Sequence, residues 1–259
     1  MTGFIGAVSV VIGGASGIGA AIAERFAKEG ATVVVADIDD DGATARATAM
    51  GAPAWAHAVQ VTAESSVGRL FDEVAAKEGR LDCVINCAGV NSVAAITDMD
   101  AADWQRVVDV SLTGAFLVVK QAALHMTGTG SIITIGSLNA RQPAAGMSAY
   151  CAAKAGVSML TEVAALELGP RGIRVNAISP GLVDTPLVGP LFAIPGMQAE
   201  FLDNTPLGRI GTPDDIADAA LFLSASQSWI TGETLNVNGG AHTRRYPDVL
   251  TSLQRSAAR

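Results

Sequence analysis

Tyr150 and Lys154 are the residues of this 259-residue chain whose types and spacing most directly suggest chemistry. Side chains four residues apart on a helix project from the same face. A phenol titrates at about pH 10 unaided, and a neighbouring ammonium group lowers its pKa toward the range that a general acid or base requires. The pair therefore predicts a tyrosine that exchanges a proton with a substrate, although an exposed pair without function would have the same spacing.

A glycine-rich turn lies far upstream of the pair. Residues 13–19 read GGASGIG, in which the first, fifth and seventh positions are spaced one residue wider than the common G-x-G-x-x-G. Glycines at a strand-to-helix turn let the backbone approach a pyrophosphate, and the helix N-terminus supplies N–H groups. A glycine cluster alone is a weak signal, but at the first strand-to-helix turn of a parallel sheet it predicts a dinucleotide site, and this site in turn favours a functional tyrosine–lysine pair. The loop residues expected to contact the cofactor are Gly13, Ser16, Gly17, Ile18 and Gly19.

Asp37 ends the next apolar run, TVVVAD (32–37). A carboxylate at this place accepts hydrogen bonds from adenosine ribose hydroxyls and repels a 2′-phosphate. Neither Ser16 in the loop nor Ile38 after the aspartate offers a cation for that phosphate. The sequence therefore favours NAD over NADP, with a helix-capping or turn aspartate as the alternative.

The elements that must position these residues alternate along the chain. Strands are expected at 7–12, 32–37, 55–61, 81–89 with its exit, 130–137, 173–179 and 234–238. Helices are expected at 17–30, 41–49, 65–79, 101–126, 148–168 and 213–224. Apolar strands that alternate with helices indicate a parallel sheet covered on both faces. We therefore expect one α/β domain over 1–259, a doubly wound Rossmann-type fold with a parallel sheet of about seven strands flanked by helices.

Two segments fall outside this alternation. Segment 184–206 has three prolines before Pro206 and a run of apolar residues that look exposed, which indicates a substrate lid rather than a core element. The tail 244–259 contains four arginines and is expected to be a solvated end or a subunit-docking extension.

Composition excludes several classes of function. The net charge is -8, without a cluster of Lys and Arg before the tail, so the footprint of a nucleic-acid binder is missing. We expect no membrane partner, because no stretch reaches the roughly 20 apolar residues of a membrane span and the apolar start lacks the positive region of a signal peptide. Three cysteines, an odd number, favour free thiols and a cytoplasmic location. The three histidines have no partners at ligand spacing, so no metal is proposed.

These motifs together resemble the short-chain dehydrogenase/reductase family over nearly the whole chain, from 7 to about 243. The matching pieces are GGASGIG, Asp37, NCAG (86–89), Ser137, YCAAK (150–154), RVNAISPG (174–181), DTP (184–186), GRIGTPDDIA and ITGETLNVNGG. The serine precedes the tyrosine by thirteen residues, the usual separation in the family. Jointly these motifs are highly specific.

The resemblance implies an oxidoreductase that transfers a hydride between NAD and a secondary alcohol or ketone. Tyr150 would exchange the proton, Ser137 would hold the substrate oxygen, and Lys154 would bind the nicotinamide ribose and lower the pKa of the tyrosine. Family helices that match 101–126 and 148–168 commonly pair across subunits, so a homotetramer is expected. Beyond the glycine loop, the implied cofactor contacts are Asp37, Ile38, Gln60, Val61, Asn86, Ala88, Gly89, Tyr150, Lys154, Pro180, Gly181, Val183 and Thr185.

Three positions depart from the family pattern. Ile12 stands where the glycine motif opens with threonine, and Gln60 stands where aspartate is usual. Ser111 replaces an asparagine that helps to hold a water between the lysine and bulk solvent. We expect the proton relay to survive through the Ser111 carbonyl and water, more slowly. The expected catalytic set is Ser137, Tyr150, Lys154 and Ser111.

The segments expected to shape the substrate pocket are mostly apolar. They indicate an alicyclic, steroid-like or otherwise hydrophobic alcohol or ketone, unless half of these side chains pack on neighbouring subunits instead. The expected substrate contacts are Ser137, Asn139, Met147, Tyr150 and Leu187. Two other functions stay open. A 3-oxoacyl thioester reductase would usually prefer NADPH, against which Asp37 counts, and a non-catalytic nucleotide-binding scaffold has only Ser111 in its support.

Overall fold

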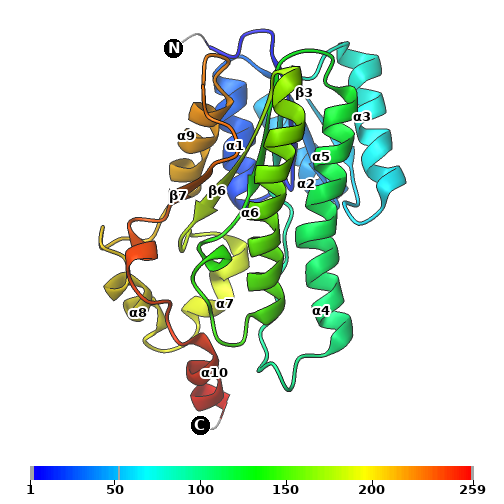
Figure 1. The fold of residues 1–259 in the computed structure, drawn as a ribbon. Helices are drawn as coiled ribbons and strands as arrows, with labels where there is room; N and C mark the ends of the chain where they lie inside the picture. The colour runs from blue at the N-terminus through cyan, green and yellow to red at the C-terminus, as the bar shows by residue number, and fades with distance from the viewer. Residues whose placement is uncertain (1–2, 52, 258–259) are drawn as a thin grey trace.

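The structure, a computed structural model, describes residues 3–51 and 53–257 as a parallel sheet with helices on both faces (Figure 1). The strands are β1 Val8–Ile12, β2 Thr32–Asp37, β3 Ala54–Ala58, β4 Cys83–Asn86, β5 Gly130–Ile135, β6 Ile173–Pro180 and β7 Thr234–Val237. They lie in the order β3-β2-β1-β4-β5-β6-β7, and all neighbouring strands are parallel. The predicted fold class and the seven strands are confirmed.

The helices are α1 Gly17–Lys28, α2 Asp40–Met50, α3 Glu64–Glu78, α4 Ala101–Val108, α5 Gly114–His125, α6 Ser148–Leu168, α7 Gly189–Phe192, α8 Met197–Asp203, α9 Pro213–Ser224 and α10 Val249–Ala257. Six of the helices, α1, α2, α3, α5, α6 and α9, cover the sheet with apolar side chains, whereas α7, α8 and α10 contribute to a separate cluster. Side chains of α3, α5 and α6, such as Phe71 and Val118, pack on one face. Side chains of α1 and α9, such as Phe26 and Ile216, pack on the other. Figure 1 shows α3, α5 and α6 side by side.

The order of the strands places a ligand site. The chain leaves β1 toward β2 on one side, whereas β4 pairs with β1 on the other. In open parallel sheets ligands bind at such a reversal, outside the carboxyl ends of the strands. The loop 13–19 follows β1, and residues 87–89 follow β4 at this point. Strand β3 ends at Ala58, earlier than the predicted residue 61, so Gln60 and Val61 belong to a loop at the same edge.

The predicted helix 101–126 is not regular. A π-helical turn, Asp109–Thr113, separates α4 from α5 and contains Ser111. Such turns insert an extra residue into a helix and are frequent at functional sites. By length and composition the whole stretch Ala101–His125 could cross a membrane, but half of its apolar window is buried inside the protein. Val118 and Ala122 of α5 belong to the core, as is usual for a core helix.

The 184–206 segment and the C-terminal tail pack on each other. Ile194, Met197 and Phe201 are buried and form a cluster with Val249 of α10. The rings of Phe201 and Tyr246 meet edge to face, with 5.5 Å between their centroids. The expectation that the apolar residues of this segment are exposed is therefore wrong for these three side chains, because the tail covers them. The tail is correspondingly not just a solvated end.

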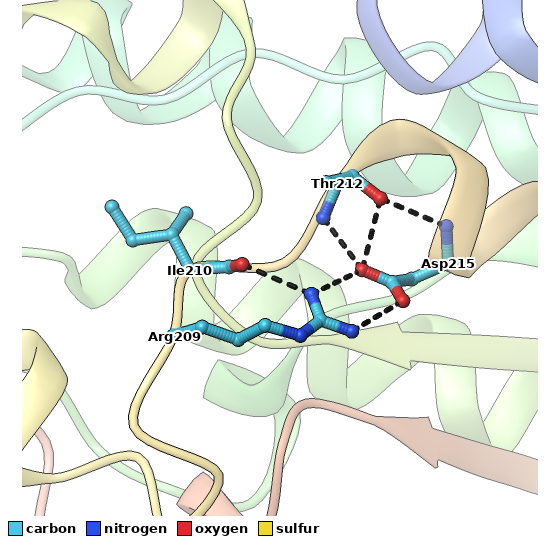
Figure 2. A network of polar contacts seen from close by, with 4 residues as sticks. All are labelled: Arg209, Ile210, Thr212 and Asp215. Carbon is cyan, nitrogen blue, oxygen red and sulfur yellow. Dashed lines mark hydrogen bonds and ion pairs between the residues drawn. The ribbon is translucent and has the colours of Figure 1, made fainter.

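A polar network fixes the chain where it returns from this segment to the sheet (Figure 2). Arg209 donates two hydrogen bonds, of 2.7 and 2.6 Å, to the carboxylate of Asp215 and holds its pKa well below the ordinary value. Thr212 and Asp215 form a capping box that starts α9. Close by, Val183 forms a parallel bridge with Gly211. The chain before and after the 184–206 segment is thus held together by the contact between Val183 and Gly211.

Candidate functional site

A cavity of about 830 Å³ lies at the carboxyl ends of the strands. It extends from Asp37 at the end of β2, past the glycine loop, to Ser137 and Tyr150. Every predicted cofactor contact except Asn86 lines it. Asn86 is buried, and its Oδ1 accepts a hydrogen bond from the Ala88 N–H at 3.1 Å, so this side chain shapes the loop after β4. The sequence-predicted residues are thus brought together by the fold.

The glycine loop requires glycines for steric reasons. Gly13 has a φ of 74°, and a Cβ there would lie 3.0 Å from the Ala88 N. A Cβ on Gly19 would overlap the Gly13 carbonyl oxygen. Gly17 has a φ of 54°, and its missing Cβ would be 3.4 Å from Thr185. The loop is therefore packed against the chain behind it and presents bare backbone to the cavity.

The N-terminus of α1 remains available to an anion. The Ser16 N-cap makes no side-chain hydrogen bond to the helix, and no acidic residue stands in the first turn. The first N–H groups of a helix lack partners within the helix and carry a partial positive charge. Since this end lines the cavity, the residues present fit a pyrophosphate group.

Asp37 braces the loop and still has acceptor capacity. Its Oδ2 accepts a hydrogen bond from the Ala15 N–H at 3.0 Å, and its Oδ1 accepts one from the Asp39 N–H at 3.1 Å. The turn role considered for this aspartate is therefore real. Each carboxylate oxygen retains a lone pair, so a pair of ribose hydroxyls fits as well. Ile38 beside it is apolar and 76% exposed.

The other end of the cavity brings the serine, the tyrosine and the lysine together. Ser137 follows β5, whereas Tyr150 and Lys154 lie in the first two turns of α6. The Lys154 ammonium donates a hydrogen bond to the Ile135 carbonyl at 2.7 Å and lies 5.5 Å from the centroid of the tyrosine ring. The side chain is 3% exposed, and burial lowers its pKa to about 8.

The pKa of Tyr150 responds to its surroundings. Burial raises it above the ordinary value, while a hydrogen bond with Ser137 acts in the opposite direction. The ammonium of Lys154 faces the ring and is held by the carbonyl of Ile135. The expectation that the lysine, together with a bound nicotinamide ring, lowers this pKa stays a prediction.

Ser111 lies beside the lysine but does not line the cavity. Its hydroxyl donates to the Val90 carbonyl and accepts from the Val90 N–H, both at 3.3 Å. A Cβ on Gly89 would stand 3.5 Å from the Lys154 Nζ and 3.7 Å from the Ser111 Oγ. The glycine thus lies between the two side chains, and Ser111 fixes the loop that carries it.

Two of the five expected substrate contacts, Asn139 and Met147, do not line the cavity. Both are buried. The Asn139 N–H donates to the Ser137 Oγ at 3.1 Å, so this residue orients the serine. The Met147 sulfur accepts a hydrogen bond from the Tyr246 hydroxyl at 3.9 Å. The expected contacts that do line the cavity are Ser137, Tyr150 and Leu187.

Sequence reasoning missed a helical face of the cavity. Five residues of α4 and the following turn line it: Ala102, Gln105, Arg106, Asp109 and Val110. The first four are spaced by three, four and seven residues from Ala102, as on one helix face, and this spacing could have identified them.

A family model described as enoyl-(acyl carrier protein) reductase matches residues 13–242. Cis-4-hydroxycyclohexanecarboxylate dehydrogenase of Sinomonas cyclohexanicum is 41% identical, over 90% of this chain and 95% of the relative. The 2,5-dichloro-2,5-cyclohexadiene-1,4-diol dehydrogenase of Sphingobium indicum is 38% identical, over 91% and 96%. 3beta-Hydroxysteroid dehydrogenase 1 of Eggerthella lenta is 39% identical, over 91% and 93%. This chain spans only 43% of the length of an uncharacterised short-chain type dehydrogenase/reductase of Sinorhizobium fredii, to which it is 39% identical.

Solved structures agree with the sequence relatives. A short-chain type dehydrogenase/reductase from Mycobacterium ulcerans superposes with a TM-score of 0.94 at 34% identity, covering 99% of this chain and 97% of that one. A 3-ketoacyl-(acyl-carrier-protein) reductase from Brucella melitensis, complexed with NADH, has a TM-score of 0.85 at 32% identity, covering 92% and 99%. The chain therefore belongs to the short-chain dehydrogenase/reductase family, oxidoreductases that bind a nicotinamide cofactor and act on CH–OH groups.

Proposed function

We propose that this protein is an NAD-dependent dehydrogenase of secondary alcohols with an alicyclic or otherwise apolar substrate. The observation that carries the proposal is the convergence of Ser137, Tyr150 and Lys154 at one end of a cavity that has Asp37 at its other end. Bound NAD would supply the hydride acceptor. The residues of the chain would bind it, orient the alcohol and move the proton.

The preference for NAD rests on the charge around the adenosine end. The Asp37 carboxylate is held toward the glycine loop by the Ala15 N–H, and a 2′-phosphate would meet this negative charge. The flanking Ser16 and Ile38 line the cavity without offering a cation.

Tyr150 is the proposed general acid and base. In alcohol oxidation it takes the hydroxyl proton while the carbinol hydrogen leaves as a hydride and the carbonyl forms. Ser137, oriented by Asn139, holds the substrate oxygen. Because burial raises the tyrosine pKa, its protonated form predominates at neutral pH and suits ketone reduction. Oxidation needs the phenolate, so its rate should increase with pH.

Lys154 is proposed to bind the nicotinamide ribose and to connect the tyrosine with solvent. Ser111 acts on the lysine only indirectly, since its hydroxyl is engaged by Val90. Its contribution is to position the loop that carries Gly89. A relay through backbone and water remains our hypothesis for the proton.

The proposed alicyclic substrate is supported by three relatives that are named after cyclic alcohols. These alcohols are a hydroxycyclohexanecarboxylate, a cyclohexadiene diol and a hydroxysteroid. It is also supported by Leu187 and Val188, apolar residues of the 184–206 segment that line the cavity. We propose that the 184–206 segment covers the substrate there.

We further propose a homotetramer in the cytoplasm. Two of the helices expected to pair across subunits, α5 and α6, carry exposed apolar side chains: Phe116, Leu124, Met159, Val163 and Leu166. Burial of such a face favours association. The three cysteines are free, as expected for a reducing compartment. Light scattering after size exclusion should give four times the mass of the chain.

A nicotinamide absorbance screen of cyclic and steroidal alcohols with NAD tests the proposed function. The wild type should oxidise at least one of them, and Tyr150→Phe should serve as the inactive control. Activity that persists unchanged in the phenylalanine variant would mean that another group is the acid or base. Tight NAD binding without turnover of any alcohol or ketone would instead favour the non-catalytic scaffold.

A second candidate is a 3-oxoacyl thioester reductase. The Brucella melitensis neighbour with NADH favours it, and so does the description of the matching family model. Reduction of an acetoacetyl thioester with NADH and with NADPH separates the two candidates. Faster reduction of the thioester than of any cyclic ketone would favour the thioester reductase over the alcohol dehydrogenase.

A further inference from the structure

A second cavity, of about 330 Å³, adjoins the turn that carries Ser137, residues 137–143, called the serine turn below. Of the described residues, only Ser137 lines both this cavity and the larger one. The other walls come from α6, from β6 and β7, and from His242 and Arg244 at the start of the C-terminal tail. The proposed function leaves this second cavity without a role.

The second cavity is cationic, although the chain as a whole has a net charge of -8. Arg141 of the serine turn and Arg244 of the tail both line it, and none of its described lining residues is acidic. Within the described part of the chain, neither arginine forms an ion pair. The next residue, Arg245, differs in both respects, because it pairs with Glu200 at 3.3 Å and does not line the cavity. Two positive charges without a counter-charge attract a small anion to this place.

The contact between the serine turn and the tail brings the two arginines together. Gln142, the neighbour of Arg141, donates a hydrogen bond to the Ala241 carbonyl at 3.3 Å and another to the carbonyl of Arg244 itself. Like charges that are held close repel each other. An anion between the two guanidinium groups removes this repulsion and accepts a charge-assisted hydrogen bond from each.

The side chain of Gln142 also supplies an acceptor that needs a donor. Its Nε2 is engaged by the two tail carbonyls, whereas its Oε1 is buried and has no hydrogen-bond partner among the described residues. A buried acceptor without a donor costs free energy. Because Gln142 lines the cavity, a ligand that carries a hydroxyl as well as negative charge can supply the missing donor.

We propose that this cavity binds a small oxyanion that carries a hydroxyl group, of which hydrogen phosphate is the simplest. Its charged oxygens accept hydrogen bonds from Arg141 and Arg244, and its hydroxyl donates to the Gln142 Oε1. The anion thereby links the C-terminal tail to the serine turn. Because the tail also completes the buried cluster of the 184–206 segment, the anion holds the cover of that segment in place. The proposal goes beyond the proposed function and does not depend on it, since no contact involves an alcohol or a nucleotide.

Titration calorimetry of the full chain with inorganic phosphate tests the binding. NAD is present throughout, so that phosphate does not occupy the N-terminus of α1. Arg141→Gln and Arg244→Gln should each weaken phosphate binding about 10-fold, because each variant loses one charge-assisted hydrogen bond. The matched control Arg245→Gln removes the same charge outside the cavity and should bind within about twofold of wild type. Sulfate has a similar shape but no hydrogen to donate, so it should bind the wild type more weakly than phosphate does.

Hydrogen–deuterium exchange tests the link between the tail and the serine turn. Phosphate should slow exchange of the amides of residues 244–257 in wild type and in Arg245→Gln, but not in Arg141→Gln. A wild type that binds no phosphate, or equal binding by all variants, would overturn the proposal. Equal affinity for sulfate and phosphate, or binding that leaves exchange of the tail unchanged, would overturn it as well. Neither measurement requires turnover, so both remain decisive if the chain oxidises no alcohol.

Discussion

Replacing Lys154 by methionine should stabilise the cofactor-free protein at neutral pH. The lysine is buried, and its pKa of about 8 lies below the ordinary 10.5. At about 1.36 kcal/mol per pKa unit, holding the charged form in the fold costs about 3 kcal/mol. The variant also loses the hydrogen bond to the Ile135 carbonyl, which offsets about 1 kcal/mol. The expected gain in the free energy of unfolding is therefore about 2 kcal/mol at pH 7.

The gain should depend on pH in a definite direction. A lysine with a lowered pKa is destabilising below the folded value of about 8, and this cost disappears as the pH rises toward the unfolded value of 10.5. Burial raises the pKa of Cys83 and Cys87 to about 12, so these thiols lose their stabilising contribution at alkaline pH. The contribution of Cys83 cancels when the free energy of one protein is subtracted from that of the other, because Lys154 does not act on this thiol. Lys154 lowers the pKa of Cys87, so its removal raises that pKa further and leaves the buried thiol neutral at pH 10 in both proteins.

Urea unfolding followed by circular dichroism measures this difference. Wild type and Lys154→Met should be compared without nucleotide, at equal protein concentration, at pH 7 and at about pH 10. The variant should be the more stable protein at pH 7, and the difference should shrink at the higher pH. Lys120→Met, at a largely exposed lysine of α5, is the matched control and should show no such trend. A Lys154→Met protein less stable than wild type at pH 7, or a difference independent of pH, would refute the reasoning.

Three further outcomes are expected. Asp37→Ser should weaken NAD binding about 10-fold and strengthen NADP binding, because it removes a hydrogen-bond acceptor for the ribose hydroxyls and a negative charge. Fluorescence titration measures both affinities, and unchanged values for the two nucleotides would contradict this prediction. Thr212→Ala should lower the free energy of unfolding by about 1 kcal/mol in urea titrations, since it removes the N-cap of α9. The lowered pKa of Asp215 means that the stability of this cap is present at neutral pH and lost on acidification. The wild type should be active, and Ser111→Asn should change its rate of alcohol oxidation by no more than about 10-fold across pH. An inactive wild type that gains activity with asparagine would contradict the hypothesis that protons pass through the backbone and water near Ser111.

The fold and most of the cavity were predictable because their signals are local. Most strands are short apolar runs, and most of the long helices have a face with helical periodicity. Parallel strands collect the residues at their carboxyl ends along one edge of the sheet. Asp37, Gly89 and Thr185 therefore line one cavity although they are distant in the chain.

What the sequence did not predict depends on contacts between distant segments. The four-residue spacing placed Lys154 on the face of Tyr150, but the direction of the ammonium is set by the Ile135 carbonyl of another element. The π-helical turn at Ser111 changes which groups that hydroxyl reaches. The position of Tyr246 follows from packing between the tail and the 184–206 segment, which no periodicity encodes.

Stopped-flow formation of NADH from a cyclic alcohol, in wild type and in Tyr150→Phe, tests the central claim most directly. NAD affinity, measured by titration in the same samples, separates chemistry from binding. We predict that the phenylalanine variant binds NAD within about twofold of wild type and forms NADH at least about 100-fold more slowly. NADH formation by Tyr150→Phe at the wild-type rate would contradict the account.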